Sequence, residues 1–130
     1  MYLMRLADRV SRGLAKVPNF PLESHRRFLL CQQAASGGFH GRDGDGDLYY
    51  TGFAVRALAV TGGLPEDPAR LLSGFLRDQN PLSLSAVDLL SWLYSAIVVE
   101  SVIGGSVLTG RSENFAADVV SGLQQLRTAD

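Results

Sequence analysis

Residues 36–51 read Ser-Gly-Gly-Phe-His-Gly-Arg-Asp-Gly-Asp-Gly-Asp-Leu-Tyr-Tyr-Thr, and they hold five of the 14 glycines of this chain. The glycines predict a loop, because glycine adopts turn conformations that other residues avoid. Asp47 precedes a run from Leu48 to Thr61 whose only charge is Arg56. We therefore predict that Asp47 caps the start of a helix and that Gly62-Gly63 ends it.

Helical periodicity extends outward from this loop in both directions. Apolar residues recur at steps of three and four, and no stretch alternates for long in the manner of a strand. Asp67-Pro68 supplies a start signal for one helix, and Ser83 or Ser85 supplies it for another. The predicted fold class is all-α, with about six helices over residues 3–17, 22–33, 48–61, 67–79, 85–103 and 112–127.

The predicted helices differ in charge. Helices 22–33, 67–79 and 113–127 are amphipathic, whereas 48–61 and 85–103 are almost uncharged, which predicts an outer and an inner layer. Each inner helix follows a similar Asp-Leu-aromatic start, at Asp47 and again at Asp88. If both aspartates cap a helix, the chain contains a repeat of paired helices, of a length within the roughly 40–47 residues known for helical arrays.

Length and composition bound the class of protein. With 130 residues, 46% apolar and 19% charged, the chain can form one independent core and is too apolar to be disordered. Its 12 basic and 13 acidic residues give a net charge of −1, so no overall basic field attracts nucleic acid or anionic lipid. We expect a single domain, residues 1–130, with no nucleic-acid partner.

The N-terminal segment and the cysteine usage favour a cytoplasmic protein. Charged residues interrupt positions 1–17, so no signal peptide is predicted. The longest uncharged apolar run, 89–99, has eleven residues, against the roughly 20 that cross a bilayer, so no membrane span is predicted. Cys31 is the only cysteine, which excludes an internal disulfide, and we predict that it is a small buried apolar residue.

Several known site motifs can be compared with the loop. An EF-hand beginning at Asp43 requires glycine and glutamate where the chain has Leu48 and Ala54, so it fails twice. A looser divalent site on Asp43, Asp45 and Asp47 remains an alternative to solvated turn aspartates. The lysine of a phosphate-binding P-loop and the strand of a dinucleotide fingerprint are both missing.

Gly-Gly-Phe-x-Gly-Arg followed by Asp-x-Tyr-Tyr-Thr resembles the repeat of protein prenyltransferase β-subunits and of squalene–hopene cyclases. The resemblance covers residues 31–63 and, more weakly, 78–105. It implies a partial α/α toroid, in which inner and outer helices surround an apolar cavity for an isoprenoid. Residues 126–130 also align with 32–36, 94 positions earlier. We therefore expect the chain to form the N-terminal part of a larger toroid.

The resemblance also assigns roles to individual residues. Arg42 stands where the prenyltransferase arginine binds the isoprenoid diphosphate, and Tyr50 matches a tyrosine that faces it. Asp47 matches a zinc-ligand aspartate, but Tyr49 occupies the position of the zinc-ligand cysteine. Zinc-activated thiol prenylation therefore lacks its thiolate. The cyclase Asp-x-Asp-Asp motif is missing as well, so no catalytic residue is assigned.

The predicted site follows from this resemblance. Arg42 and Tyr50 would bind an anionic head group, and Tyr49, Phe53 and Trp92 would line the apolar cavity. No cofactor is predicted; Asp47 is the candidate ligand for zinc or magnesium that the resemblance implies. Other interpretations stay open: Arg42 could pair with Asp43 or Asp45 or bond loop carbonyls, Asp47 could be only a helix cap, and the aromatic residues could be core.

Two functions are consistent with these residues. In the first, the chain is a prenyltransferase-like protein that binds an isoprenoid or another apolar ligand with an anionic head group. In the second, it is a non-catalytic helical module whose exposed apolar edge is covered by a second copy or by another helical chain. The low charge and the missing cysteine favour the second function.

Overall fold

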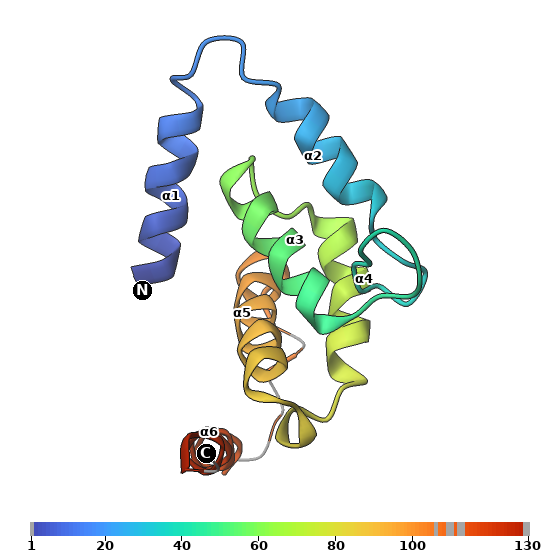
Figure 1. Ribbon diagram of the computed structural model, residues 1–130, viewed down its shortest axis with the longest axis vertical. Helices are drawn as coiled ribbons and strands as arrows, with labels where there is room; N and C mark the ends of the chain where they lie inside the picture. The colour runs from blue at the N-terminus through green and yellow to red at the C-terminus, as the bar shows by residue number, and fades with distance from the viewer. Residues whose placement is uncertain (1, 106, 109–110, 112–113, 129–130) are drawn as a thin grey trace.

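The computed structural model describes residues 2–105, 107–108, 111 and 114–128 (Figure 1). These residues form no strand, and their one β-type pairing is an isolated bridge between Gln33 and Phe39. The all-α prediction with about six helices is confirmed. The helices are α1 (Tyr2–Leu14), α2 (Leu22–Cys31), α3 (Leu48–Val60), α4 (Glu66–Arg77), α5 (Ala86–Ile103) and α6 (Phe115–Thr128), with a 3-10 turn η1 (Pro81–Ser83).

Helix α5 is the centre of the fold because it packs against both α3 and α4. Gly52 of α3 permits the close approach of α5, since a Cβ atom there would lie 2.8 Å from the Ser91 hydroxyl oxygen. Each large apolar side chain buried at these contacts stabilises the fold by about 1.5–3 kcal/mol. The largest fully buried side chains from the three helices include Val55, Leu58, Leu72, Leu76, Trp92 and Val99.

The apolar character of α5 reaches the threshold for a membrane span. Among the described residues, it is the one helix that could cross a bilayer by length and composition, although it includes Asp88 and Glu100. The sequence-based prediction of no membrane span considered only the uncharged residues 89–99, which lie between Asp88 and Glu100. A core helix of a soluble protein passes the same test, and α5 packs against both α3 and α4, so this property alone assigns no membrane span.

The helix starts confirm the predicted caps at Asp47 and Ser85 and correct those at Asp88 and Asp67. Asp47 caps α3, because its carboxylate accepts a 2.8 Å hydrogen bond from the Tyr50 backbone N–H. In α5 the cap is Ser85, and Asp88 lies one turn further along, where its own N–H donates to the Ser85 hydroxyl. Asp47 therefore precedes its helix, whereas Asp88 lies inside the first turn of its helix. The predicted repeat, which aligned the two aspartates as equivalent caps, is wrong in that alignment. Helix α4 begins at Glu66, so Asp67 is not its cap.

The terminal helices lie at the margins of this core. Helix α1 packs on α3, and residues 15–21 connect it to α2 across the end of the molecule (Figure 1). Helix α6 packs on η1, and its Phe115 ring meets the Trp92 indole edge to face at 5.8 Å. The alignment of 126–130 with 32–36 includes positions 129 and 130, which lie outside the described residues.

Candidate functional site

The glycine-rich loop between α2 and α3 folds back on the end of α2. The backbone N–H of His40 donates to the Gln32 carbonyl at 3.0 Å, and that of Asp47 donates to the Phe39 carbonyl at 3.0 Å. Phe39 is fully buried, and its N–H donates to the Thr51 hydroxyl at 2.9 Å. Because that buried N–H would otherwise lack a partner, Thr51 fixes the loop to the first turn of α3.

Two glycines of the loop are required by close contacts. Gly37 has a φ of +97°, and a Cβ atom there would collide with the Leu71 carbonyl of α4. Gly41 lies under the ring of Tyr50, so that a Cβ atom there would come within 2.6 Å of the ring carbon Cζ. The first glycine seats the loop on α4, and the second lets the Tyr50 ring lie flat against the loop.

Side chains fix the loop and the neighbouring helices. The Gln33 amide donates to the carbonyls of Gly37 and Pro68, both at 2.9 Å, which ties the loop to α4. Asp45 accepts from the Gly46 N–H at 2.7 Å and from the Ser36 hydroxyl at 3.0 Å, and these bonds hold its pKa below the usual range. Arg26 of α2 donates to the Gly63 carbonyl at the end of α3.

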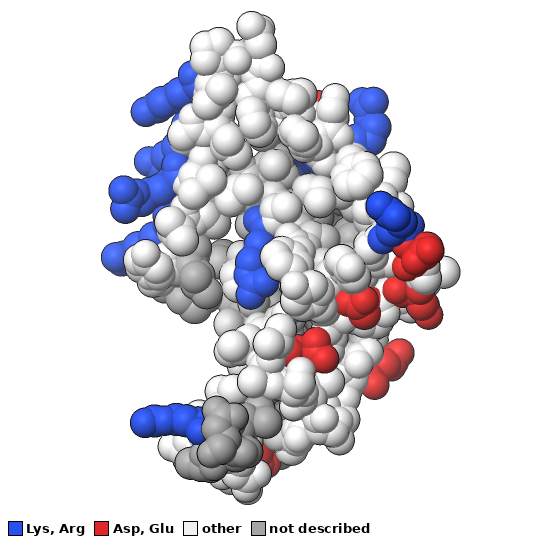
Figure 2. All heavy atoms as spheres, in the orientation of Figure 1, with Lys and Arg blue, Asp and Glu red and all other residues white. Residues whose placement is uncertain are grey.

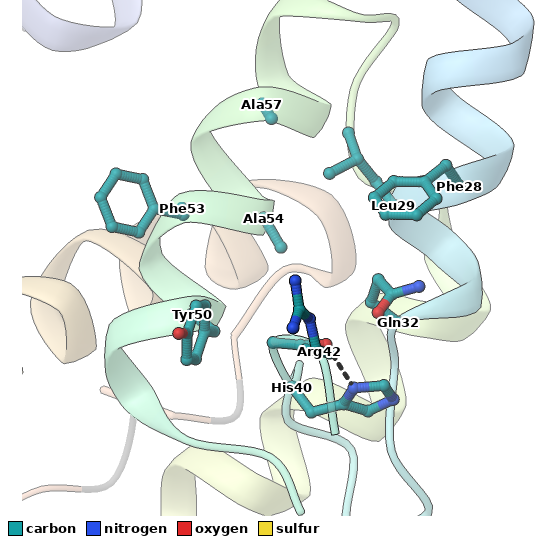
Figure 3. A pocket seen from close by; sticks show the side chains of 10 residues that line it. Phe28, Leu29, Gln32, His40, Arg42, Tyr50, Phe53, Ala54 and Ala57 are labelled. Carbon is teal, nitrogen blue, oxygen red and sulfur yellow. Dashed lines mark hydrogen bonds between the residues drawn. The ribbon is translucent and has the colours of Figure 1, made fainter. Parts of the chain in front are cut away.

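A pocket of about 610 Å³ lies between α2, the loop and α3, and we call it the α2–α3 pocket (Figure 3). Its walls are mostly apolar side chains and glycine, and its polar side chains come from Gln32, His40, Arg42 and Tyr50. The complete lining is Phe28, Leu29, Gln32, His40, Gly41, Arg42, Tyr50, Phe53, Ala54 and Ala57.

Arg42 is the one charged side chain in this lining, apart from any charge on His40. Figure 3 shows its guanidinium pointing into the space between α2 and α3. No hydrogen bond or ion pair joins Arg42 to any residue that the structure describes, so the suggested pairing with Asp43 or Asp45 is wrong. The neighbouring His40 Nδ1 lies 2.9 Å from the Gly41 carbonyl, which can only accept, so Nδ1 carries the hydrogen.

The structure brings three of the predicted site residues together and separates the others. Arg42, Tyr50 and Phe53 all line the α2–α3 pocket, with Phe53 at its far edge (Figure 3). Tyr49 lies outside it, in edge-to-face contact with the rings of Tyr50 at 5.6 Å and Phe53 at 4.9 Å. Trp92 is not in the pocket lining: it is fully buried, and its indole N–H donates to the Leu76 carbonyl at 2.9 Å.

The sequence interpretation missed every residue that α2 and its C-terminal end contribute, and also the small residues of α3. Phe28, Leu29 and Gln32 form one wall, and their role depends on how α2 docks. The opposite wall did carry a signal, because Tyr50, Ala54 and Ala57 follow helical spacing and put small side chains on one face.

Metal ligands do not gather in the described part of the chain. No group of three or more His, Cys, Asp or Glu side chains there could hold a metal ion. The carboxylate of Asp47, the predicted ligand, accepts the capping hydrogen bond instead. Cys31 is exposed at the end of α2, contrary to the prediction of a buried side chain. These residues give no basis for a zinc or magnesium centre.

No protein-family model, curated protein or solved structure matches this chain.

Proposed function

We propose that the α2–α3 pocket binds a small amphiphile with an anionic head group and an apolar, isoprenoid-like tail. The observation that carries this proposal is Arg42, an exposed guanidinium with no partner among the described residues, directed into an apolar cavity. A guanidinium binds carboxylate or phosphate oxygens through two parallel hydrogen bonds. The bonds are stronger beside apolar walls than in open water, because the local dielectric constant is lower.

The tail would lie between the two helices. Phe28 and Leu29 of α2 face Ala54 and Ala57 of α3 across the pocket, and the alanines leave room for a chain of linked carbons. A volume of about 610 Å³ falls within the roughly 300–1,000 Å³ typical of small-molecule sites. Gln32, His40 and Tyr50 add further polar groups near Arg42, which suits a head group with several oxygen atoms.

The proposal extends to a prenyltransferase-like fold, with α3 and α5 as inner helices of a partial toroid and α2 and α4 as outer ones. The side-by-side packing of the nearly uncharged α3 and α5 supports it. Binding is proposed rather than prenyl transfer, because Tyr49 stands where the family has its zinc thiolate.

The experiment is calorimetric titration of the full chain with farnesyl diphosphate, farnesol and inorganic diphosphate. We expect the diphosphate ester to bind more tightly than either part alone, because it occupies both the arginine and the apolar walls. Arg42→Gln should weaken its binding by about tenfold or more, the value of a charge-assisted hydrogen bond. Arg27→Gln is the matched control, since Arg27 is exposed on α2 and lies outside the pocket lining.

Equal losses of affinity in the two arginine variants would show that the head group is attracted only by the overall surface charge and does not bind Arg42 specifically. Absence of binding by all three compounds would refute the proposal. Chemical shift changes on titration give a second readout, and they should centre on Tyr50, Ala54 and Ala57.

A further inference from the structure

A second apolar surface lies along α3 and α5, and part of it is uncovered. We call it the α3–α5 face. Tyr49 and Phe53 of α3 and Val87 and Leu90 of α5 are each about half exposed there. These four side chains, with Arg56 and Ser91, line a hollow of about 200 Å³. Contiguous exposed apolar side chains of this kind mark interaction sites more often than isolated ones.

The same face continues under α1. A neighbouring hollow of about 160 Å³ is lined by Leu6, Ala7 and Val10 of α1 on one side, and by Arg56, Val60 and Tyr94 on the other. Arg56 lines both hollows and lies 4.9 Å above the centre of the Tyr94 ring, so the two hollows meet at this residue. The chain therefore already places an amphipathic helix on one half of the α3–α5 face.

Helix α1 is only partly covered by this contact. Leu6 and Val10 of its apolar stripe are each 41% exposed, although they point toward the face. An exposed apolar stripe on α1, formed by Leu6 and Val10, thus lies beside the exposed half of the α3–α5 face, with Arg56 between them. We call the space between these two surfaces the trough. A helix that filled this trough would contact both surfaces at once and would cover apolar groups that no described residue covers.

The charges around the trough specify what kind of helix fits. Asp47 and Asp88 line an adjoining hollow with Tyr49 and Leu84, beside the end of the face that lies away from α1, whereas Arg56 is the one charged residue that lines the two hollows of the face itself. Helix α1 carries Arg5, Arg9 and Arg12 against Asp8 alone. Figure 2 shows basic side chains along the outward side of α1 and acidic ones gathered across the molecule. A basic amphipathic helix therefore complements the acidic end of the trough, and this chain contains one.

We propose that a second copy of this chain covers the α3–α5 face by docking its α1 into the trough. The arrangement is reciprocal, because each copy carries both the helix and the trough, and reciprocal contacts close into a twofold dimer. The two α1 helices and the two α3–α5 faces then form a joint apolar core, with basic residues of each α1 near Asp47 and Asp88 of the other copy.

The test is sedimentation velocity of the full chain over a series of concentrations. We expect a monomer–dimer equilibrium. Leu90→Arg should raise the dimer dissociation constant by about tenfold or more, because it places a buried positive charge against a basic helix. The matched control is Leu71→Arg on α4, where the side chain is 56% exposed against 52% for Leu90 and lines none of these hollows.

A charge exchange tests the occupant itself. Chains with Arg5→Glu and Arg9→Glu, and separate chains with Asp88→Arg, should each dimerise more weakly than the natural chain. Mixing the two variants should restore dimerisation, because both contacts of the mixed pair then join opposite charges. Thermal melts of each variant, monitored by circular dichroism, establish that the loss lies in association rather than in folding.

Three results would overturn the proposal. The first is a monomer at every concentration. The second is an equal effect of Leu90→Arg and Leu71→Arg. The third is a chain that stays monomeric but binds vesicles containing anionic lipid, with loss of that binding in the Leu90→Arg chain, which would make a lipid surface the occupant.

Discussion

Helix α3 has two apolar faces, and different parts of the chain lie opposite each of them. On one side Tyr50, Ala54 and Ala57 face α2 and the glycine-rich loop, which form the opposite walls of the α2–α3 pocket. On the other side Tyr49 and Phe53 lie on the exposed α3–α5 face, which α1 covers only in part. Two adjacent tyrosines point to different sites because successive residues of a helix are about 100° apart. The two roles that we propose for the faces of α3, a small-molecule site and a docking surface, thus differ in which parts of the chain lie opposite each face.

The position of the loop that forms one wall of the α2–α3 pocket depends on Gly37, and replacing this glycine gives the largest expected effect. Gly37→Ala puts a Cβ atom against the Leu71 carbonyl at a backbone angle that disfavours alanine, so the loop must leave α4. We expect a loss of about 2–4 kcal/mol in the free energy of unfolding, measured by urea denaturation.

Gly44→Ala is the matched control for this change. Gly44 also has a positive φ, of +93°, but no atom lies within 4 Å of its added Cβ, so only the backbone preference is lost. That loss should cost about 1 kcal/mol. Equal costs at the two positions would show that the loop does not rest on α4. Self-association of the folded fraction should survive both changes, since neither residue touches the α3–α5 face.

A smaller and more selective effect is expected at Gly41. Gly41→Ala brings a Cβ atom within 2.6 Å of the Tyr50 ring, which is free to swing aside because it is about half exposed. The free energy of unfolding should change by less than about 1 kcal/mol, whereas farnesyl diphosphate should bind several-fold more weakly because the displaced ring alters the pocket. An unchanged affinity would show that Tyr50 is not part of the binding surface.

The arrangement of the glycine-rich loop and the start of α3 was more predictable than that of the α3–α5 face. Asp47, Arg42 and Tyr50 are close in the chain, and a glycine-rich turn into a capped helix necessarily brings them near each other. The helices were predictable for a related reason, because periodicity is a local property of the sequence.

What could not be predicted depends on how the helices dock. Trp92 was expected in a cavity wall, but the packing of α5 against α4 turns it into the core, where it bonds the Leu76 carbonyl. Cys31 was expected to be buried, but the way α2 docks on the rest of the fold leaves its thiol exposed. A single sequence does not contain the angle at which two helices meet.

The smallest expected effect lies at the outer edge of the loop, at Asp45. Hydrogen bonds from the Gly46 N–H and then from the Ser36 hydroxyl lower its pKa in the folded chain. The stabilisation from this carboxylate is therefore fully present above its unfolded pKa, near 3.9, and is lost as the pH falls through the lower folded value.

Ser36→Ala removes one donor and should move the pKa of Asp45 upward, part of the way to its ordinary value. An NMR titration of the Asp45 carboxyl carbon measures both chains, and an unmoved midpoint would show that the serine bond does not persist in water. Because Asp45 is exposed, neither change should alter the α3–α5 face or the dimer that we propose there.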